Sequence, residues 1–336
     1  GRSTDPYWEA FLMDPADMSE AQLNLIASGF FNANYDRFIK RSQRYRELFA
    51  KRSGTSDWRV FSASEIRDIQ VHFILSWLGQ SLKKLPEVQE LIRKDRDYTE
   101  EDKRILVQLC QQRVKSIIPY YRRIARNGNI QLTTSPYYHP ILPLLCDVEV
   151  ARQSNPLTKL PKKPFIYPCD ASRQVKSGVE FFSKLFQVRA SGMWLPEGGV
   201  SEEILSIVID SGITHIFSDE DILRKSLAES FGEQVELTPS RLYKPYRIHR
   251  GRDNIDIFFR DKRLSDKIGF VYYNMDESAA VSDFIASLGR IKDALPDGEE
   301  GYIVSVILDG ENAWEYYRDN GELFLTELYE KLLSSD

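Results

Sequence analysis

The pattern of hydrophobic and polar positions divides the chain into a helical first part and an alternating remainder. In residues 1–128, apolar side chains recur at helical spacing. Two of these stretches open with a capping box, in which a serine is followed three residues later by glutamine or glutamate. The helices predicted from these patterns cover residues 19–48, 62–79 and 99–127, the last with a kink at Pro119.

From residue 129 onward, short β-like runs alternate with helical stretches. The predicted strands are 130–134, 212–217, 255–261 and 302–308, and the predicted helices are 171–186, 201–210, 278–295 and 323–333. This alternation predicts a parallel sheet, closed into a barrel or left open. We therefore expect an α/β protein with a helical subdomain at 1–128 and a βα-repeat region at 129–336.

One predicted strand indicates where a functional site is expected. Residues 302–308 are rich in Ile and Val and have no polar alternation beyond Ser305, a pattern typical of a strand that is buried on both faces. Asp309 follows at the carboxyl end of this run. Ligands in α/β folds bind at the carboxyl ends of strands, so this aspartate lies where chemistry is expected.

Composition and charge narrow the function. Residues 1–128 carry 22 Lys+Arg against 17 Asp+Glu, a balance of +5, and the remainder carries 23 against 33, a balance of −10. The acidic second part argues against a phosphate-rich substrate and against nucleic-acid binding. The 17 Tyr, 18 Phe and 5 Trp fill a large core, and a minority of such rings serve sugar-binding proteins as flat platforms.

The cysteines and the longest apolar runs indicate a cytoplasmic protein. Cys110, Cys146 and Cys169 are odd in number and lack metal-ligand spacing, which is typical of reduced thiols. No apolar run approaches the ~20 residues of a membrane span, and the first residues do not resemble a signal peptide. We expect no membrane partner, no cofactor and no metal.

Polar residues recur at the predicted strand ends. Those expected to converge on one face of a barrel are Ser135, His139, Glu197, Asp219, Glu220, Arg260, Asp261, Asp309 and Glu311. Paired carboxylates, few histidines and no cysteine cluster favour glycoside hydrolysis, in which one carboxylate attacks or polarises and the other donates a proton. Glu311 would raise the pKa of Asp309 through like charge. Arg260 and Asp261 are interpreted as an ion pair.

The four histidines support different interpretations. His72 lies on an apolar helix and His215 in the middle of a strand, so both are expected to be structural. His139 lies in a proline-rich loop, where it is suited to bonding a substrate hydroxyl. No H-x-H or H-x-x-x-H spacing supports a metal site.

Four motifs in order resemble glycoside hydrolase family 57, the amylopullulanase and α-amylase-like group. They are QLTTSPYYHPILPL at 131–144, GMWLPEGGVS at 192–201, FSDE at 217–220 and ILDGENAWE at 307–315. The resemblance implies an incomplete (β/α)7 TIM-like barrel that acts on α-glucans with retention of configuration. By this likeness, Glu197 would be the nucleophile and Asp309 the general acid/base. The further substrate-binding residues implied are His139, Trp194, Asp219, Glu220, Glu311 and Trp314.

The first motif of the family, a His-Gln-Pro-like segment on the opening barrel strand, does not occur in these 336 residues. The resemblance therefore implies that the first βα unit is missing from this chain. Three sources of that unit stay open: a second polypeptide, a disordered segment, or a stretch of chain outside these 336 residues. A non-catalytic glucan-binding or regulatory protein on the same scaffold is one alternative to a hydrolase or transglycosylase. A metal-dependent polysaccharide deacetylase on a similar barrel is another, disfavoured by the scarcity of histidine.

Overall fold

The computed structural model describes residues 5–52, 57–232, 235–298, 300–310 and 314–334. The chain forms two compact units. Unit 1 comprises Gly1–Ser116, Tyr272–Val281 and Gly310–Asp336, and unit 2 comprises Ile117–Val271 and Ser282–Asp309. The helices α7 (Glu100–Arg126) and α15 (Glu277–Asp293) contribute residues to both units. The division into domains 1–128 and 129–336 stays a prediction.

Unit 1 is helical. Besides its parts of α7 and α15, it contains α1 (Pro6–Leu12), α2 (Glu20–Gly29), α3 (Gln43–Arg52), α4 (Ala63–Trp77), α5 (Gln80–Lys83), α6 (Pro86–Lys94) and α16 (Glu322–Ser334). Both predicted capping boxes are present, at Ser19 with Gln22 and at Ser62 with Glu65. They satisfy backbone N–H groups that the first turn of a helix leaves without partners.

The single helix predicted over 19–48 is wrong. The structure ends α2 at Gly29 and begins α3 at Gln43. Between them, the side chain of Asn34 accepts a hydrogen bond from Arg37 N at 3.0 Å. Such a side-chain bond offers the backbone an alternative to the helix, which is why asparagine favours turns.

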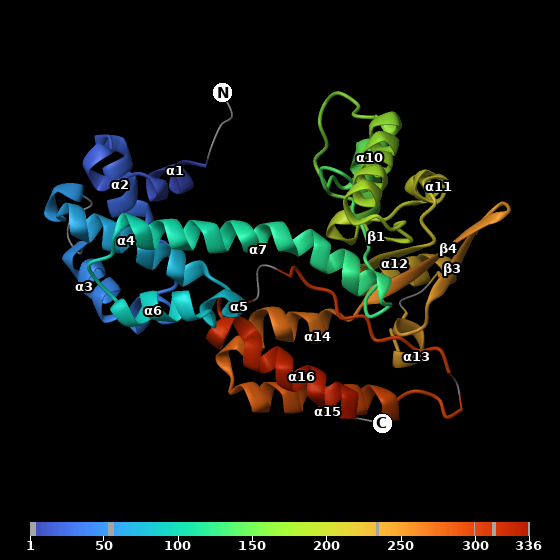
Figure 1. Cartoon of the computed structure of the whole chain (residues 1–336). Helices are drawn as coiled ribbons and strands as arrows, with labels where there is room; N and C mark the ends of the chain where they lie inside the picture. The colour runs from blue at the N-terminus through green and yellow to red at the C-terminus, as the bar shows by residue number, and fades with distance from the viewer. Residues whose placement is uncertain (1–4, 53–56, 233–234, 299, 311–313, 335–336) are drawn as a thin grey trace. The chain divides into compact units, whose positions relative to one another are not determined.

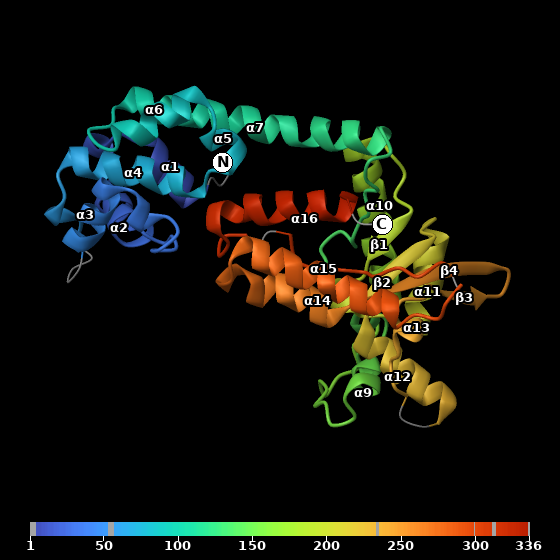
Figure 2. The same ribbon diagram turned by 90° about the horizontal axis from the view of Figure 1, so that it is seen from below.

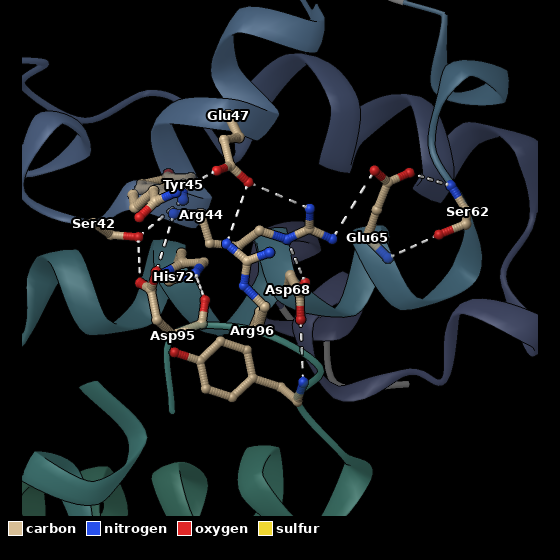
Figure 3. A network of polar contacts seen from close by, with 12 residues as sticks. Ser42, Arg44, Tyr45, Glu47, Ser62, Glu65, Asp68, His72, Asp95 and Arg96 are labelled. Carbon is tan, nitrogen blue, oxygen red and sulfur yellow. Dashed lines mark hydrogen bonds and ion pairs between the residues drawn. The ribbon is translucent and has the colours of Figure 1, made fainter. Parts of the chain in front are cut away.

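The core of unit 1 combines apolar packing with a buried polar network. Ile26, Ile69 and Leu106 are fully buried. Beside them, the buried carboxylate of Asp68 accepts a hydrogen bond from Arg44 Nε at 2.8 Å (Figure 3). His72, predicted to be structural, is 4% exposed and its Nε2 lies 2.8 Å from Asp95 O.

Unit 2 is built on a four-stranded sheet in the order β1-β2-β4-β3 (Figure 1). The strands are β1 (Gly192–Trp194), β2 (His215–Asp219), β3 (Tyr246–Arg250) and β4 (Asp253–Arg260). β1, β2 and β4 are parallel, whereas β3 pairs antiparallel with β4. Figure 2 shows the β3–β4 hairpin projecting beyond the other strands. The predicted parallel sheet is present in β1, β2 and β4, and the antiparallel β3, joined to β4 by a tight hairpin, makes the sheet mixed.

Helices surround this sheet. They are α8 (Leu142–Cys146), α9 (Ala151–Ser154), α10 (Pro168–Phe186), α11 (Glu202–Asp210), α12 (Glu220–Phe231), α13 (Pro239–Leu242) and α14 (Lys262–Asp266). Gly178 lets α10 approach the loop at Ser135, since a Cβ there would lie 2.5 Å from Ser135 O. This contact fixes the loop that leads to His139.

The predicted buried strand at 302–308 is not formed as expected. Only Ser305 makes a bridge, parallel to Arg260, and Ile303 is 47% exposed. The bridge aligns Ser305 with Arg260, the last residue of β4, so the residues after Ser305 run beyond the end of β4 and have no strand partner there among the described residues. A similar result holds for 130–134, where Thr134 alone forms a bridge, parallel to Met193.

Candidate functional site

Glu197 lies in a tight turn directly after β1. Its backbone has φ 57° and ψ 18°, in the left-handed region that non-glycine residues rarely adopt. Gly198 follows with φ 66°, and its N–H donates to Leu195 O at 2.8 Å. The Glu197 side chain is exposed. Backbone strain in a turn that presents a carboxylate is typical of functional sites.

The end of β2 packs against this turn. Buried Ser218 donates from its hydroxyl to Gly198 O at 2.6 Å. A Cβ on Gly198 would lie 3.2 Å from the backbone nitrogen of Asp219. Glycine is therefore needed at position 198 both for its positive φ and for this close approach. As a result, the backbones that carry Glu197 and Asp219 are next to each other.

Asp219 and Glu220 begin helix α12. Asp219 accepts from Asp221 N at 2.9 Å and forms an ion pair with Arg260 Nη1 at 3.4 Å. Glu220 accepts from Lys262 N at 3.1 Å. Burial raises the pKa of Glu220 above its ordinary value, although the hydrogen bond from Lys262 N lowers it. The nearby charges of Asp261 and Asp219 raise the pKa further. The two neighbouring carboxyl groups thus have different environments.

Asp309 lies at the same edge of the sheet. Ser305 is aligned in parallel with Arg260, the last residue of β4, and Ser305 O accepts from Asp261 N at 2.8 Å. Since this segment runs parallel to β1, β2 and β4, its carboxyl end points the same way as theirs. Asp309 is exposed there. Glu311 lies outside the described residues.

His139 belongs to a loop that borders the Glu197 turn. Thr134, aligned with Met193, places the start of this loop beside β1. His139 is exposed with φ 56°, and its N–H donates to Pro136 O at 2.9 Å. Two residues later, Ile141 Cγ2 lies 3.1 Å from the Cβ position of Gly199. Trp194, the last residue of β1, is half-buried.

Trp314 belongs to unit 1 rather than to unit 2. Its ring centroid lies 5.4 Å from that of Tyr317. A Cβ on Gly321 would lie 2.6 Å from the Trp314 ring.

In unit 2, five predicted site residues lie along one edge of the sheet together with Trp194. They are His139, Glu197, Asp219, Glu220 and Asp309.

The predicted ion pair between Arg260 and Asp261 is wrong. Arg260 pairs instead with Asp219 and with Asp266, whose Oδ1 lies 2.6 Å from Nη2. Asp261 is buried and accepts from the hydroxyl of Tyr243 at 2.6 Å and from Leu264 N at 2.8 Å. Consecutive residues at the end of a strand point to opposite faces, so the two side chains diverge.

Sequence reasoning missed the roles of Arg260 and Ser265 around the Asp309 segment. Arg260 Nε donates to Ile307 O at 2.8 Å, and Ile307 N donates to Ser265 Oγ at 3.1 Å. An arginine at the carboxyl end of a predicted strand was the available signal.

Within the described ranges, no group of three His, Cys, Asp or Glu residues could hold a metal ion. Among the described helices, none is both long and apolar enough to span a membrane.

These features define an α/β protein whose strand ends present carboxylates at one edge. The chain belongs to glycosyl hydrolase family 57, whose model matches residues 1–336. A search of curated proteins found no match.

Several solved structures are similar, among them two branching enzymes and a glucanotransferase. A GH57-type branching enzyme from the hyperthermophilic archaeon Pyrococcus horikoshii is 15% identical, with a TM-score of 0.51, over 100% of this chain and 65% of that one. The GH57 branching enzyme TK1436 from Thermococcus kodakaraensis is 15% identical, with a TM-score of 0.49, over 98% and 65%. A 4-alpha-glucanotransferase from Thermococcus litoralis is 17% identical, with a TM-score of 0.48, over 69% and 30%. The chain thus spans between 30% and 65% of the length of these proteins.

Proposed function

We propose that this chain carries the catalytic carboxylates of a retaining α-glucan hydrolase or transglycosylase, with Glu197 as nucleophile and Asp309 as general acid/base. One observation carries the proposal. In this chain of family 57, the segment at 302–308, which we call the Ser305 segment, runs parallel to β1, β2 and β4. Both carboxylates therefore follow the carboxyl ends of parallel segments. An incomplete (β/α)7 barrel, completed by a second chain or segment, is part of this proposal.

The chemistry assigns one step to each carboxylate. Glu197 attacks the anomeric carbon as the glycosidic C–O bond breaks, and Asp309 gives its proton to the departing oxygen. Asp309, now a carboxylate, then takes a proton from water or from a sugar hydroxyl, whose oxygen displaces Glu197 from the anomeric carbon. Water as acceptor gives hydrolysis, and a sugar hydroxyl gives transfer.

The surroundings of Glu197 suit its role as the nucleophile. Glu197 is exposed in a turn whose backbone is fixed by Gly198 and Ser218, so the carboxylate can meet a substrate without rearrangement. His139 and Trp194 border the same turn and would contact the sugar. Asp219 and Glu220 would contact further hydroxyl groups of the glucan.

The proposal also makes a geometric demand. Retaining pairs have carboxyl groups about 5–5.5 Å apart. Three interstrand spacings of about 4.8 Å separate β1 from the Ser305 segment, so a flat sheet would hold the two ends about 14 Å apart. The curvature of a barrel, together with the loops that carry Glu197 and Asp309, would have to close this difference.

The deciding experiment is proton NMR of the anomeric signals during incubation of the chain with a maltooligosaccharide. We expect an initial α-product, and a loss of about 10³-fold or more in Glu197→Gln. Glu202→Gln is the matched control, because Glu202 is a highly exposed glutamate at the start of the next helix and should leave turnover unchanged. An initial β-product, or full activity of Glu197→Gln, would refute the assignment. Glucan binding without turnover by the unmutated chain, also in the presence of the second chain or segment that completes the barrel, would instead favour a non-catalytic binding protein.

A further inference from the structure

The guanidinium of Arg260 joins three separate parts of unit 2. Nε donates to Ile307 O at 2.8 Å, Nη1 lies 3.4 Å from Asp219, and Nη2 lies 2.6 Å from Asp266. The side chain is only 18% exposed. Because a guanidinium is planar and rigid, contacts through all three nitrogens fix the relative positions of the groups they touch.

The bond to Ile307 matters because the backbone there has few other supports. The Ser305 segment makes one parallel bridge to β4, at Arg260 itself. At Ile307, both backbone groups are bonded to side chains: the carbonyl accepts from Arg260, and the N–H donates to Ser265 Oγ at 3.1 Å. Side chains thus supply the hydrogen bonds that a neighbouring strand would otherwise make.

Asp309 follows Ile307 by two residues, and two residues of fully extended chain span at most about 7 Å. On its other side, Arg260 contacts Asp219, whose backbone nitrogen packs against Gly198 in the Glu197 turn. One guanidinium is therefore linked to the segment before Asp309 and, through Asp219, to the turn that presents Glu197.

We propose that Arg260 is a positioning residue that sets Asp309 in the place required for proton transfer, and that Ser265 assists it. This inference rests on the proposed function of Glu197 and Asp309. Arg260 itself does not contact the reacting atoms. It acts by fixing the backbone at Ile307, so that the Asp309 proton can pass to the glycosidic oxygen as the C–O bond breaks and the bond to Glu197 forms.

Arg260→Lys tests this role because lysine keeps the positive charge but has one nitrogen in place of three. The two substrates are a maltooligosaccharide, whose leaving oxygen needs a proton, and α-maltosyl fluoride, whose fluoride leaves without one. A displacement of about 1 Å costs about 100-fold in rate, so we expect kcat/KM for the oligosaccharide to fall about 100-fold. For the fluoride we expect a loss below about fivefold, because kcat/KM reports the glycosylation step, in which fluoride needs no acid.

Arg247→Lys is the matched control. Arg247 forms a two-pronged ion pair with Asp256 in the same sheet, at 2.7 and 2.9 Å, without any hydrogen bond to the Ser305 segment. This variant should retain kcat/KM on both substrates. Ser265→Ala provides a second variant, and we expect the same preference for fluoride with a smaller loss on the oligosaccharide.

A double variant separates positioning from general structural damage. If Arg260 acts through Asp309, then Arg260→Lys in an Asp309→Asn background should lower the oligosaccharide rate by less than about threefold further. Equal losses on both substrates, undiminished activity of Arg260→Lys, or full additivity with Asp309→Asn would each overturn the inference while leaving the proposed function in place. Absence of turnover of either substrate by the unmutated chain, also in the presence of the second chain or segment that completes the barrel, would overturn both.

Discussion

Replacing Asp68 by asparagine tests the buried polar network of unit 1. The Asp68 side chain is 0% exposed, and it accepts hydrogen bonds from Arg44 Nε at 2.8 Å and from Tyr98 N at 3.1 Å (Figure 3). Asparagine has nearly the same shape, so packing is preserved. It removes the negative charge, and it can turn its carbonyl oxygen toward only one of the two donors.

The expected loss follows from the surroundings of Arg44. Removing one partner of a buried ion pair costs about 3–5 kcal/mol. Here the Arg44 side chain is 16% exposed and retains Glu47 at 3.8 Å and Glu65 at 4.0 Å, which lowers the expected penalty. The donor left without an acceptor adds about 1 kcal/mol or more. We therefore expect Asp68→Asn to lower the free energy of unfolding by about 3 kcal/mol.

Urea unfolding followed by tryptophan fluorescence measures this loss, because Trp8, Trp58, Trp77 and Trp314 belong to unit 1 whereas Trp194 belongs to unit 2. The slope of free energy against urea should be unchanged.

Glu47→Gln is the control for this variant. Glu47 faces the same arginine, but its side chain is 42% exposed, so its loss should be below about 0.5 kcal/mol. Equal losses in Asp68→Asn and Glu47→Gln would refute the argument that burial makes the Arg44 contact important.

Three further predictions concern other positions. Burial lowers the pKa of His72 below its ordinary value, although the hydrogen bond to Asp95 O acts in the opposite direction. The stability that neutral His72 contributes is therefore complete above about pH 6.5 and is lost as the pH falls. We expect His72→Gln to flatten the fall in unfolding free energy between about pH 7 and 5. Gly192→Ala would place a Cβ 2.3 Å from His215 Nε2 and should destabilise the protein by about 1–3 kcal/mol in thermal unfolding. Gly289→Ala, inside α15, should instead stabilise it by about 0.5–1 kcal/mol in the same assay, because the new Cβ would have no described atom within 4 Å apart from its chain neighbours and the backbone of its own helix.

The sequence predicts best what is decided locally. The two capping boxes fixed the starts of α2 and α4 because their hydrogen bonds join residues three positions apart. The end of α2 was missed because a turn begins at Gly29, where Asn32 N donates to Gly29 O at 3.0 Å, and apolar periodicity does not register such a turn. Hydrophobic spacing alone therefore overestimated helix length.

The β-structure depends on partners that lie far away in the sequence. The segment at 302–308 has the composition of a buried strand, but its pairing depends on where β4 ends, because Ser305 is aligned with the last residue of β4. The same limit applies to the ion pair predicted for Arg260. One of its two actual partners, Asp219, is 41 positions away, and the parallel register of β2 and β4 brings the two together.

The candidate site follows from this arrangement. The direction of β2 and β4 could be predicted from the alternation of helices and strands, and with it the edge at which Asp219 and Asp309 lie, whereas β1, which precedes Glu197, was not among the predicted strands. How firmly Asp309 is held could not be predicted, since its segment has one parallel bridge and depends on side chains at Ile307. If the proposed chemistry is correct, a carboxylate that must both give and take a proton is supported by an arginine and a serine rather than by a continuous strand. Its reactivity should therefore be more sensitive to Arg260 and Ser265 than the stability of the sheet is.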